Sequence, residues 1–246
     1  MLNHAGRVFL FDVDNTLLDN DRFAADLTER LDREFGEHQR KRYWSLYDER
    51  RDRLGYADYL GTLQTFRDGV EDPPELLLMS QFIIDYPFQE RVYPGAHAAL
   101  EHLQSFGTTV ILTDGDIVFQ PRKVQRSGLW DAVDGRVLVT RHKERRTGLI
   151  EERYPALRYV MIDDKPKLLS AMKQVLGELL TTVFVHQGHY ADESDGKRFD
   201  CPPDVRIDRI GDLCELSAAD FRTGTPTGIP NPDRASMREP TIPEQS

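Results

Sequence analysis

The sequence predicts an α/β fold, in which a parallel β-sheet is covered by helices and a helical segment is inserted after the first strand. Three observations support this fold class. A short run of apolar, strand-forming residues, Val8–Phe11, stands near the start of the chain. The stretch from Asp21 to about Gly69 has helical periodicity and little strand character. From Pro94 onward, helical and strand-like segments alternate, which is typical of a parallel sheet with helices on its faces.

The inserted segment is predicted to contain four helices. The first has an apolar residue at every fourth position, which gives one stripe of an amphipathic helix: Phe23, Leu27, Leu31 and Phe35. Tyrosines and leucines predict two more helices, over 43–54 and 56–66, and residues 75–84 predict a fourth. We therefore expect residues 19–87 to form a helical cap, and residues 1–18 and 88–222 to form the α/β core.

The core is predicted to continue with alternating elements. Further strands are expected at 108–112, 136–140, 159–162, 181–185 and 205–207. Helices are expected between and after them, at 96–106, 118–126, 147–153, 168–176 and 213–216. Residues 223–246 are rich in Thr, Pro, Gly and Asn and contain few large apolar side chains, so we expect a disordered tail.

The composition argues against several classes of function. The chain has 246 residues and a net charge of −10, which disfavours general affinity for nucleic acid or for an anionic membrane. Two cysteines, Cys201 and Cys214, are too few for a disulfide framework. Neither a secretory signal nor a stretch approaching the roughly 20 apolar residues of a membrane span is visible. We expect a cytoplasmic protein, monomeric or homodimeric, with neither nucleic acid nor membrane as a partner.

Asp12, Asp14 and Thr16 follow the first strand at every second position. Two carboxylates placed so close repel each other and lose hydration, so their burial costs free energy. A bound cation offsets this cost, because it keeps both groups ionised at neutral pH. With a metal present, Asp12 can attack an electrophile while Asp14 moves protons. The alternative interpretation is an acidic turn, since Asp and Asn are ordinary turn formers.

Two further polar clusters follow predicted strands, and the carboxyl ends of parallel strands meet at one edge of a sheet. Thr113-Asp114-Gly115 offers a hydroxyl and backbone N–H groups to phosphate oxygens, or it is a plain turn. Asp163-Asp164 ends a buried strand and again calls for a cation, for which Mg²⁺ suits the hard oxygen ligands. The alternative for this pair is a cap for the helix that begins near Pro166.

Lys143 lies shortly after another predicted strand, in a basic segment. A phosphoryl group beside Asp12 would carry excess negative charge even with one divalent cation. An ammonium at this point offsets that charge and helps to hold Asp12 ionised. Arg141 is a competitor for this role, and a solvated basic loop is the alternative interpretation.

The segment Phe11-Asp-Val-Asp-Asn-Thr-Leu17 resembles the first motif, DxDxT, of the haloacid dehalogenase superfamily, whose commonest members are magnesium-dependent phosphatases. Thr113, Lys143 and Asp163-Asp164 resemble the next three motifs in order, so the resemblance spans about 7–190. It implies a Rossmann-like core with a C1-type cap. Glu144 stands where a Pro often follows the family's lysine, which leaves Arg141 open as the cation.

The resemblance implies a role for each of these residues. Asp12 would be phosphorylated, Asp14 would act as general acid and base, and Lys143 would complete the catalytic group. The expected phosphate-binding residues are Thr16, Thr113, Asp114 and Gly115. The expected Mg²⁺ ligands are Asp12, Asp14, Asp163 and Asp164, with Asp164 bound directly and Asp163 assisting or bound through water.

These roles predict a Mg²⁺-dependent phosphate monoester hydrolase that acts on a small phosphorylated metabolite through an aspartyl phosphate. A phosphomutase or phosphotransferase of the same superfamily would use the same residues. A dehalogenase or phosphonatase is less favoured, because the resemblance places those members among proteins without the second Asp. A catalytically idle binding module would not need Asp12, Asp14, Lys143 and Asp164 together.

Overall fold

The computed structural model describes residues 6–70, 74–192 and 198–221, and within them six strands form one parallel sheet. The strands lie in the order β3-β2-β1-β4-β5-β6. Their bounds are Arg7–Phe11 (β1), Thr108–Asp114 (β2), Val137–Thr140 (β3), Arg158–Asp163 (β4), Leu180–Val185 (β5) and Val205–Ile207 (β6). The order reverses between β1 and β4, and ligands of such sheets bind at the carboxyl ends of the strands beside this reversal.

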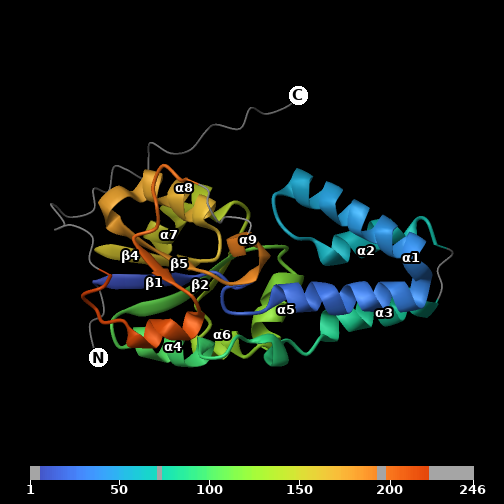
Figure 1. Ribbon diagram of the computed structural model, residues 1–246, viewed down its shortest axis with the longest axis horizontal. Helices are drawn as coiled ribbons and strands as arrows, with labels where there is room; N and C mark the ends of the chain where they lie inside the picture. The colour runs from blue at the N-terminus through green and yellow to red at the C-terminus, as the bar shows by residue number, and fades with distance from the viewer. Residues whose placement is uncertain (1–5, 71–73, 193–197, 222–246) are drawn as a thin grey trace.

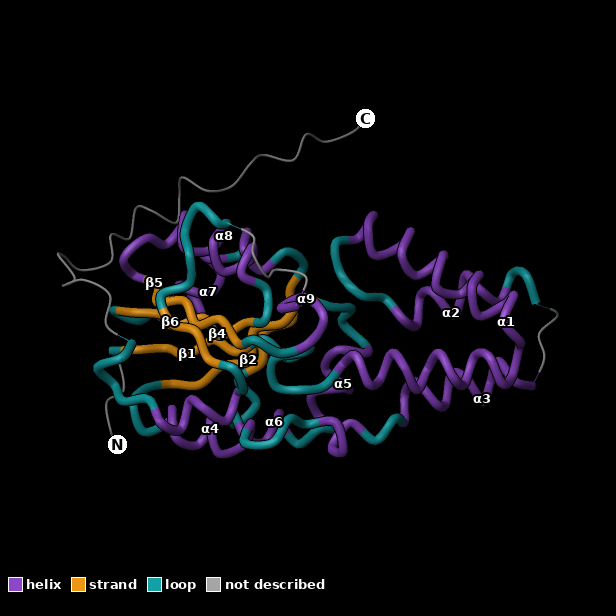
Figure 2. Tube along the Cα trace, in the orientation of Figure 1, coloured by secondary structure: helices purple, strands orange, loops and turns teal. Residues whose placement is uncertain are grey.

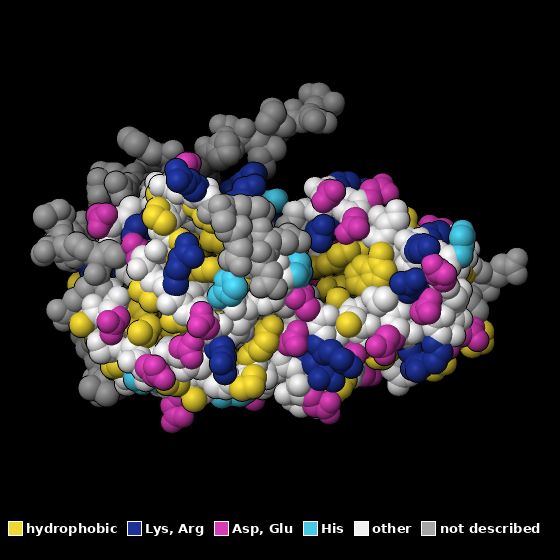
Figure 3. Space-filling view, viewed as in Figure 1, with side chains coloured by type: hydrophobic (Ala, Val, Ile, Leu, Met, Phe, Trp, Pro, Cys, Tyr) yellow, Lys and Arg dark blue, Asp and Glu magenta, His cyan; other side chains and the backbone are white. Residues whose placement is uncertain are grey.

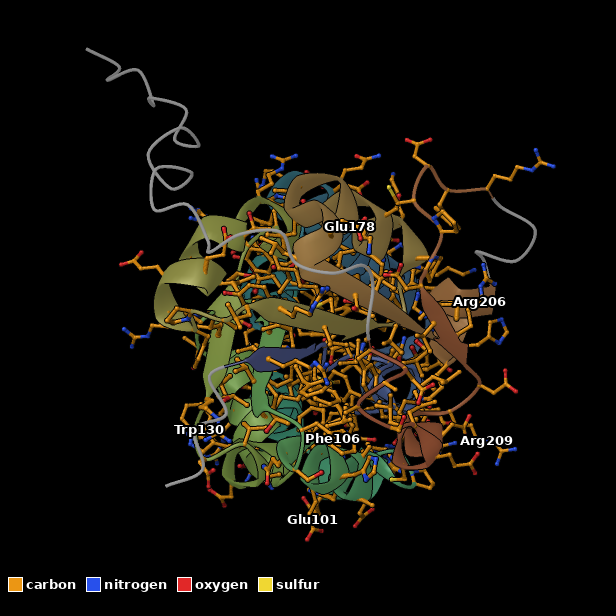
Figure 4. The ribbon with its side chains drawn as sticks, turned by 90° about the vertical axis from the view of Figure 1, so that its left-hand side faces the viewer. Glu101, Phe106, Trp130, Glu178, Arg206 and Arg209 are labelled. Carbon is orange, nitrogen blue, oxygen red and sulfur yellow. The ribbon has the colours of Figure 1, made fainter. Side chains whose placement is uncertain are left out.

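Helices cover both faces of the sheet (Figure 1). They are Asn20–Leu54 (α1), Tyr59–Arg67 (α2), Pro74–Asp85 (α3), Ala96–Gln104 (α4), Phe119–Arg126 (α5), Leu129–Ala132 (α6), Thr147–Arg153 (α7), Pro166–Leu176 (α8) and Gly188–Asp192 (α9). Short 3₁₀ helices span Phe88–Arg91, Lys143–Arg145, Gly177–Leu179 and Ile210–Glu215. Helices α7 and α8 lie on one face, and α4 and α6 lie on the other. Figure 4 shows these layers end-on, with Glu101 of α4 on one side and Glu178 on the other.

Side chains of the central strands alternate between the two helical layers, as the pleat of a strand requires. From β1, Phe9 and Phe11 join the apolar cluster that includes α4, whereas Val8 and Leu10 join the cluster that includes α7 and α8. Both faces of the strand are therefore buried, which explains why Val8–Phe11 is an uninterrupted apolar run. The predicted α/β fold with a Rossmann-like parallel sheet is confirmed.

The inserted segment contains α1, α2 and α3, and the strands are confined to the other half of the molecule (Figure 2). The two helices predicted over 23–35 and 43–54 are the two halves of α1. They are separated at Gly36, whose φ of 77° and ψ of 169° are not helical. A side chain strongly disfavours this conformation, so glycine permits the chain to change direction there.

Aromatic side chains join the cap to the core. Phe23 of α1 lies with its ring centroid 5.1 Å from that of Phe88 and 5.9 Å from that of Phe119 at the start of α5. Tyr59 of α2 lies 5.0 Å from Phe23 by the same measure. Each contact between aromatic rings of this kind stabilises the folded protein by about 0.5–1.5 kcal/mol, in addition to the contribution from the apolar area that it buries. The cap is therefore attached to the core by packing as well as by the chain.

The structure also differs from the predicted elements. Helices α6 and α9 form where no helix was expected, and the helix expected at 213–216 begins earlier, as a 3₁₀ helix, at Ile210. Helix α9 has a distant cause, because the backbone N–H of His189 donates to the Asp21 carboxylate across 168 positions of sequence. The expected tail at 223–246 lies outside the described residues. Among the described residues, each helix is too short or too polar to cross a lipid bilayer.

Candidate active site

A cavity of about 390 Å³ lies between the carboxyl ends of the strands and the cap. The core contributes mainly charged groups to its lining: Asp12, Asp14, Thr113, Asp114, Lys143 and Lys165. The cap contributes four aromatic groups, Trp44, Tyr47, Tyr56 and Tyr59, together with charged groups that include Asp48 and Arg51. On the face seen in Figure 3, hydrophobic side chains gather over the cap, beside acidic and histidine side chains nearer the core. The cavity thus joins a polar floor to an apolar wall.

Asp12 occupies the floor of this cavity at the end of β1. Its backbone N–H donates to the Ile162 carbonyl across a distance of 3.0 Å, which continues the pairing of β1 with β4. Its carboxylate lies 2.5 Å from the Lys143 ammonium and is buried. Burial favours the neutral acid, but the ammonium groups of Lys143 and Lys165 outweigh it and lower the pKa of Asp12. Asp12 is therefore a buried carboxylate that stays ionised at neutral pH.

Lys143 is held between two carboxylates by a loop that Asp114 organises. The Asp114 carboxylate accepts from the backbone N–H of Lys143 at 3.0 Å and from the Thr140 hydroxyl at 2.8 Å. The Lys143 ammonium lies 2.6 Å from Asp163 as well as against Asp12. Burial opposes its charge, but these two carboxylates raise the pKa of Lys143 above its ordinary value. Arg141 is exposed, so of the two candidates from the sequence it is Lys143 that contacts Asp12.

Three buried carboxylates converge at the ends of β1 and β4. Asp12, Asp163 and Asp164 each bring an oxygen within 4.8 Å of the others. One oxygen of Asp164, Oδ2, is buried with no hydrogen-bond partner among the described residues. Burial raises the pKa of the Asp164 carboxyl well above its ordinary value, and repulsion from Asp163 and Asp12 adds to the rise, against the pull of Lys165. Hard oxygen donors with an unused lone pair fit a divalent cation such as Mg²⁺.

Asp14, the other predicted metal ligand, lies apart from this group of three. Its Oδ1 is 2.7 Å from the ammonium of Lys123, and its Oδ2 accepts from Gln120 at 3.3 Å. Lys123 is fully buried, with four aromatic rings within 6 Å of its nitrogen, and it also donates to Asn20 of α1 at 3.0 Å. The side chain of Asp14 is thus oriented by α5 and reaches the cavity beside Asp12.

The predicted phosphate-binding residues divide into two groups. The Thr113 hydroxyl accepts from Gln120 at 2.8 Å at the edge of the cavity. Gly115 lets the Gln120 side chain approach closely, because a Cβ at position 115 would lie 2.8 Å from that side chain. The backbone N–H of Gly115 donates to the Thr140 carbonyl. Thr16 is fully buried, where it accepts from the Asp164 backbone N–H at 3.1 Å. Of these residues, Thr113 and Asp114 line the cavity.

Sequence reasoning missed two of the lysines that face these carboxylates. Lys123 stands four residues after Phe119 on the buried face of α5, so a lysine on an apolar stripe was the available signal. Lys165 directly follows Asp163-Asp164, and its Nζ lies 3.0 Å from Asp164 Oδ1 and 3.8 Å from Asp12 Oδ2. A cation next to an acidic pair was the signal there.

Comparisons with known proteins agree with this geometry. A family model described as haloacid dehalogenase-like hydrolase matches residues 7–175. The chain is similar to a Burkholderia xenovorans protein described as a haloacid dehalogenase-like hydrolase, with 54% identity, a TM-score of 0.82 and coverage of 89% of this chain and 99% of that one. It has the fold of L-2-haloacid dehalogenase from Xanthobacter autotrophicus, with 20% identity, a TM-score of 0.57 and coverage of 86% and 98%. It likewise has the fold of a Thermotoga maritima protein described as a beta-phosphoglucomutase, with 15% identity, a TM-score of 0.56 and coverage of 85% and 97%. No curated protein matches the sequence.

Proposed function

The chain belongs to the haloacid dehalogenase-like hydrolase family, and we propose that it is a phosphatase acting on a small phosphorylated metabolite in the cytoplasm. The observation that carries this proposal is the pair Asp12 and Asp14. Asp12 is buried and ionised against Lys143, and Asp14 faces the same cavity with both oxygens oriented. A nucleophile beside a separate proton carrier is what ester hydrolysis in two steps requires.

In the first step, a carboxylate oxygen of Asp12 attacks phosphorus, and the bond from phosphorus to the ester oxygen breaks. Asp14 enters this step in its protonated form and gives the proton to the departing oxygen, which leaves as an alcohol. In the second step, water attacks phosphorus and loses a proton to Asp14. The bond between phosphorus and Asp12 breaks, and inorganic phosphate and the free carboxylate are released. Lys143 and the Thr113 hydroxyl stabilise the negative charge on the transferring group.

Asp12, Asp163 and Asp164 would hold the Mg²⁺ of this phosphatase, since their oxygens converge and Asp164 Oδ2 is unused. When bound, the divalent cation supplies positive charge to the phosphoryl group and keeps the carboxylates ionised together. We expect activity to disappear with a chelator and to return with added Mg²⁺. Full activity of chelator-treated enzyme would contradict this assignment.

The cap supplies the wall against which the rest of the substrate packs. Trp44, Tyr47 and Tyr56 offer apolar rings, and Arg51 offers a positive charge at the same cavity. Because the cap packs on the core through Phe23, a bound substrate would lie between cap and core, where its leaving group limits the access of water to the aspartyl phosphate. A cavity of about 390 Å³ suits a small metabolite and is too small for a nucleic acid.

Release of phosphate from p-nitrophenyl phosphate tests the proposal. With Mg²⁺ present, the wild-type protein should release phosphate, and Asp12→Asn should lose this activity while it still folds and unfolds cooperatively, because the amide keeps the shape of the side chain but cannot act as the nucleophile. Asp134→Asn is the matched control, since Asp134 is exposed and pairs with Arg136 far from the cavity. It should keep full activity. Halide release from a 2-haloacid, without phosphate release from any phosphate ester, would identify a dehalogenase instead.

A further inference from the structure

Lys165 brings a second ammonium to the site, which the proposed reaction does not use. Its Nζ lies 3.0 Å from Asp164 Oδ1 and 3.8 Å from Asp12 Oδ2, so it contacts two of the three converging carboxylates. Lys143 contacts Asp12 and Asp163 from another side. Three carboxylates are therefore faced by two ammonium groups that belong to the chain itself.

The position of Lys165 is fixed by its backbone. It is the residue before α8, with Pro166 at the first helical position, and its N–H donates to Asp163 Oδ1 at 2.9 Å. The backbone of Lys165 is therefore held directly beside the acidic pair, within reach of its own ammonium. On its other side the ammonium lies 4.8 Å from the ring centroid of Tyr190 in α9, within the range of a cation–π contact.

We propose that Lys165 is a tethered cation that competes with the divalent ion for this carboxylate site. In the absence of the ion, the ammonium neutralises Asp164 and Asp12. Binding of the ion requires the Lys165 ammonium to move away from the Asp164 oxygen. The Tyr190 ring then offers this ammonium a second partner nearby. The affinity of the site for Mg²⁺ is therefore weaker than three buried carboxylates alone would provide. The inference rests on the metal site of the proposed function and not on the reaction catalysed there.

For two physical reasons, Lys165 should weaken the binding of the divalent ion and not assist it. A positive charge within 3–4 Å of the ligand oxygens repels an incoming divalent ion, and in a partly buried site water screens this repulsion only weakly. An oxygen that accepts from an ammonium also has one lone pair fewer for a metal. Lys143 contacts Asp12 and Asp163 but not the Asp164 oxygens, so Lys165 is the lysine that meets the expected direct ligand.

Calorimetric titration with MgCl₂, without substrate, measures the competition directly. Lys165→Met should bind Mg²⁺ at least about tenfold more tightly than the wild type, because one opposing charge is removed. Lys167→Met is the matched control: Lys167 is exposed in the first turn of α8, two residues after Lys165, and its removal should change the affinity by less than about twofold, since exposed charges are screened. Equal or weaker binding by Lys165→Met would overturn the proposal, as would the absence of Mg²⁺ binding in both proteins.

Melting temperature gives a second readout that does not depend on catalysis. In chelator, Lys165→Met should melt below the wild type, because Asp164 and Asp12 lose a neutralising partner. Added Mg²⁺ should raise its melting temperature more than that of the wild type, as tighter binding to the folded state requires. Should Lys165→Met not fold, Lys165→Gln keeps a donor without the charge and should show the same tighter binding. A Mg²⁺-induced rise that is equal in variant and wild type would contradict competition, whether or not the protein proves to be a phosphatase.

Discussion

Lys123 shows how a single residue links the proposed proton carrier to the cap. Its fully buried ammonium lies 2.7 Å from Asp14 and 3.0 Å from Asn20 at the start of α1. Rings of α1, α2 and α5 surround it, with the Phe119 centroid nearest at 5.4 Å. A buried charge of this kind persists only when its partner and the surrounding rings compensate for lost hydration. The orientation of Asp14 therefore depends on the cap being in place.

Removal of Lys123 should affect both stability and turnover. We expect Lys123→Met to lower the free energy of unfolding by roughly 1–3 kcal/mol, less than for a fully buried pair because Asp14 keeps some solvent contact. Phosphatase kcat should fall, since Asp14 loses the group that orients it. Urea unfolding and steady-state kinetics measure the two effects. Lys41→Met, at an exposed position of α1, is the control and should change neither.

The double variant Asp14→Asn with Lys123→Met separates charge from packing. It leaves no uncompensated carboxylate, so it should unfold at a higher urea concentration than Lys123→Met alone. An additive loss of stability in the double variant would mean that Lys123 acts through its packing and not through its ion pair with Asp14.

Helix α1 shows how one element shapes the cap. Its two halves carry different parts of the molecule: the first half joins the core through Phe23, and the second half bears Trp44 and Tyr47 of the cavity wall. The break at Gly36 sets the direction between them. The aromatic wall is therefore positioned by a residue that is not itself among those lining the cavity.

Substitution of Gly36 tests this element in isolation. No heavy atom lies within 4 Å of the place where a Cβ would stand, so Gly36→Ala changes the backbone preference alone. With a φ of 77° the variant should lose roughly 1–3 kcal/mol in the free energy of unfolding. Gly148→Ala in α7 is the matched control, because its Cβ position is equally open and its φ is not in the left-handed region. The free energy of unfolding of this control should rise by about 0.5–1 kcal/mol, because alanine favours the helical backbone more than glycine does. Equal urea midpoints for the two variants would contradict a strained break at Gly36.

At the scale of the whole molecule, the core supplies the catalytic carboxylates and lysines, and the cap supplies an aromatic wall. This division follows from topology, because the cap is inserted directly after the first strand, between Asp14 and the rest of the sheet. The carboxyl ends of β1, β2, β3 and β4 then bring Asp12, Thr113, Lys143 and Asp163 to one edge. Specificity can therefore change through the cavity-lining residues of the cap, as long as the cap side chains around Lys123 that help to orient Asp14 are kept.

The sequence was sufficient for the features that have a local or periodic signal. The strand at Val8–Phe11 and the helix at 147–153 have such signals, and strand order then brings Asp12 and Asp163 together. Lys123 and Lys165 were not predicted as site residues, because what a flexible lysine contacts depends on packing between distant elements. Helix α9 was not predicted for the same reason, since the Asp21 carboxylate that accepts from its His189 N–H belongs to the distant helix α1. Tertiary contacts, more than local propensity, decided these positions.

Covalent labelling of Asp12 tests the central claim, that this residue carries the phosphoryl group, most directly. The enzyme is mixed with Mg²⁺ and p-nitrophenyl phosphate, quenched in acid during turnover and digested, and its peptides are weighed by mass spectrometry. The peptide containing Asp12 should gain the mass of one phosphoryl group, and the corresponding peptide of Asp12→Asn should not. A phosphoryl group on another residue, or turnover with no labelled peptide at any quench time, would contradict it.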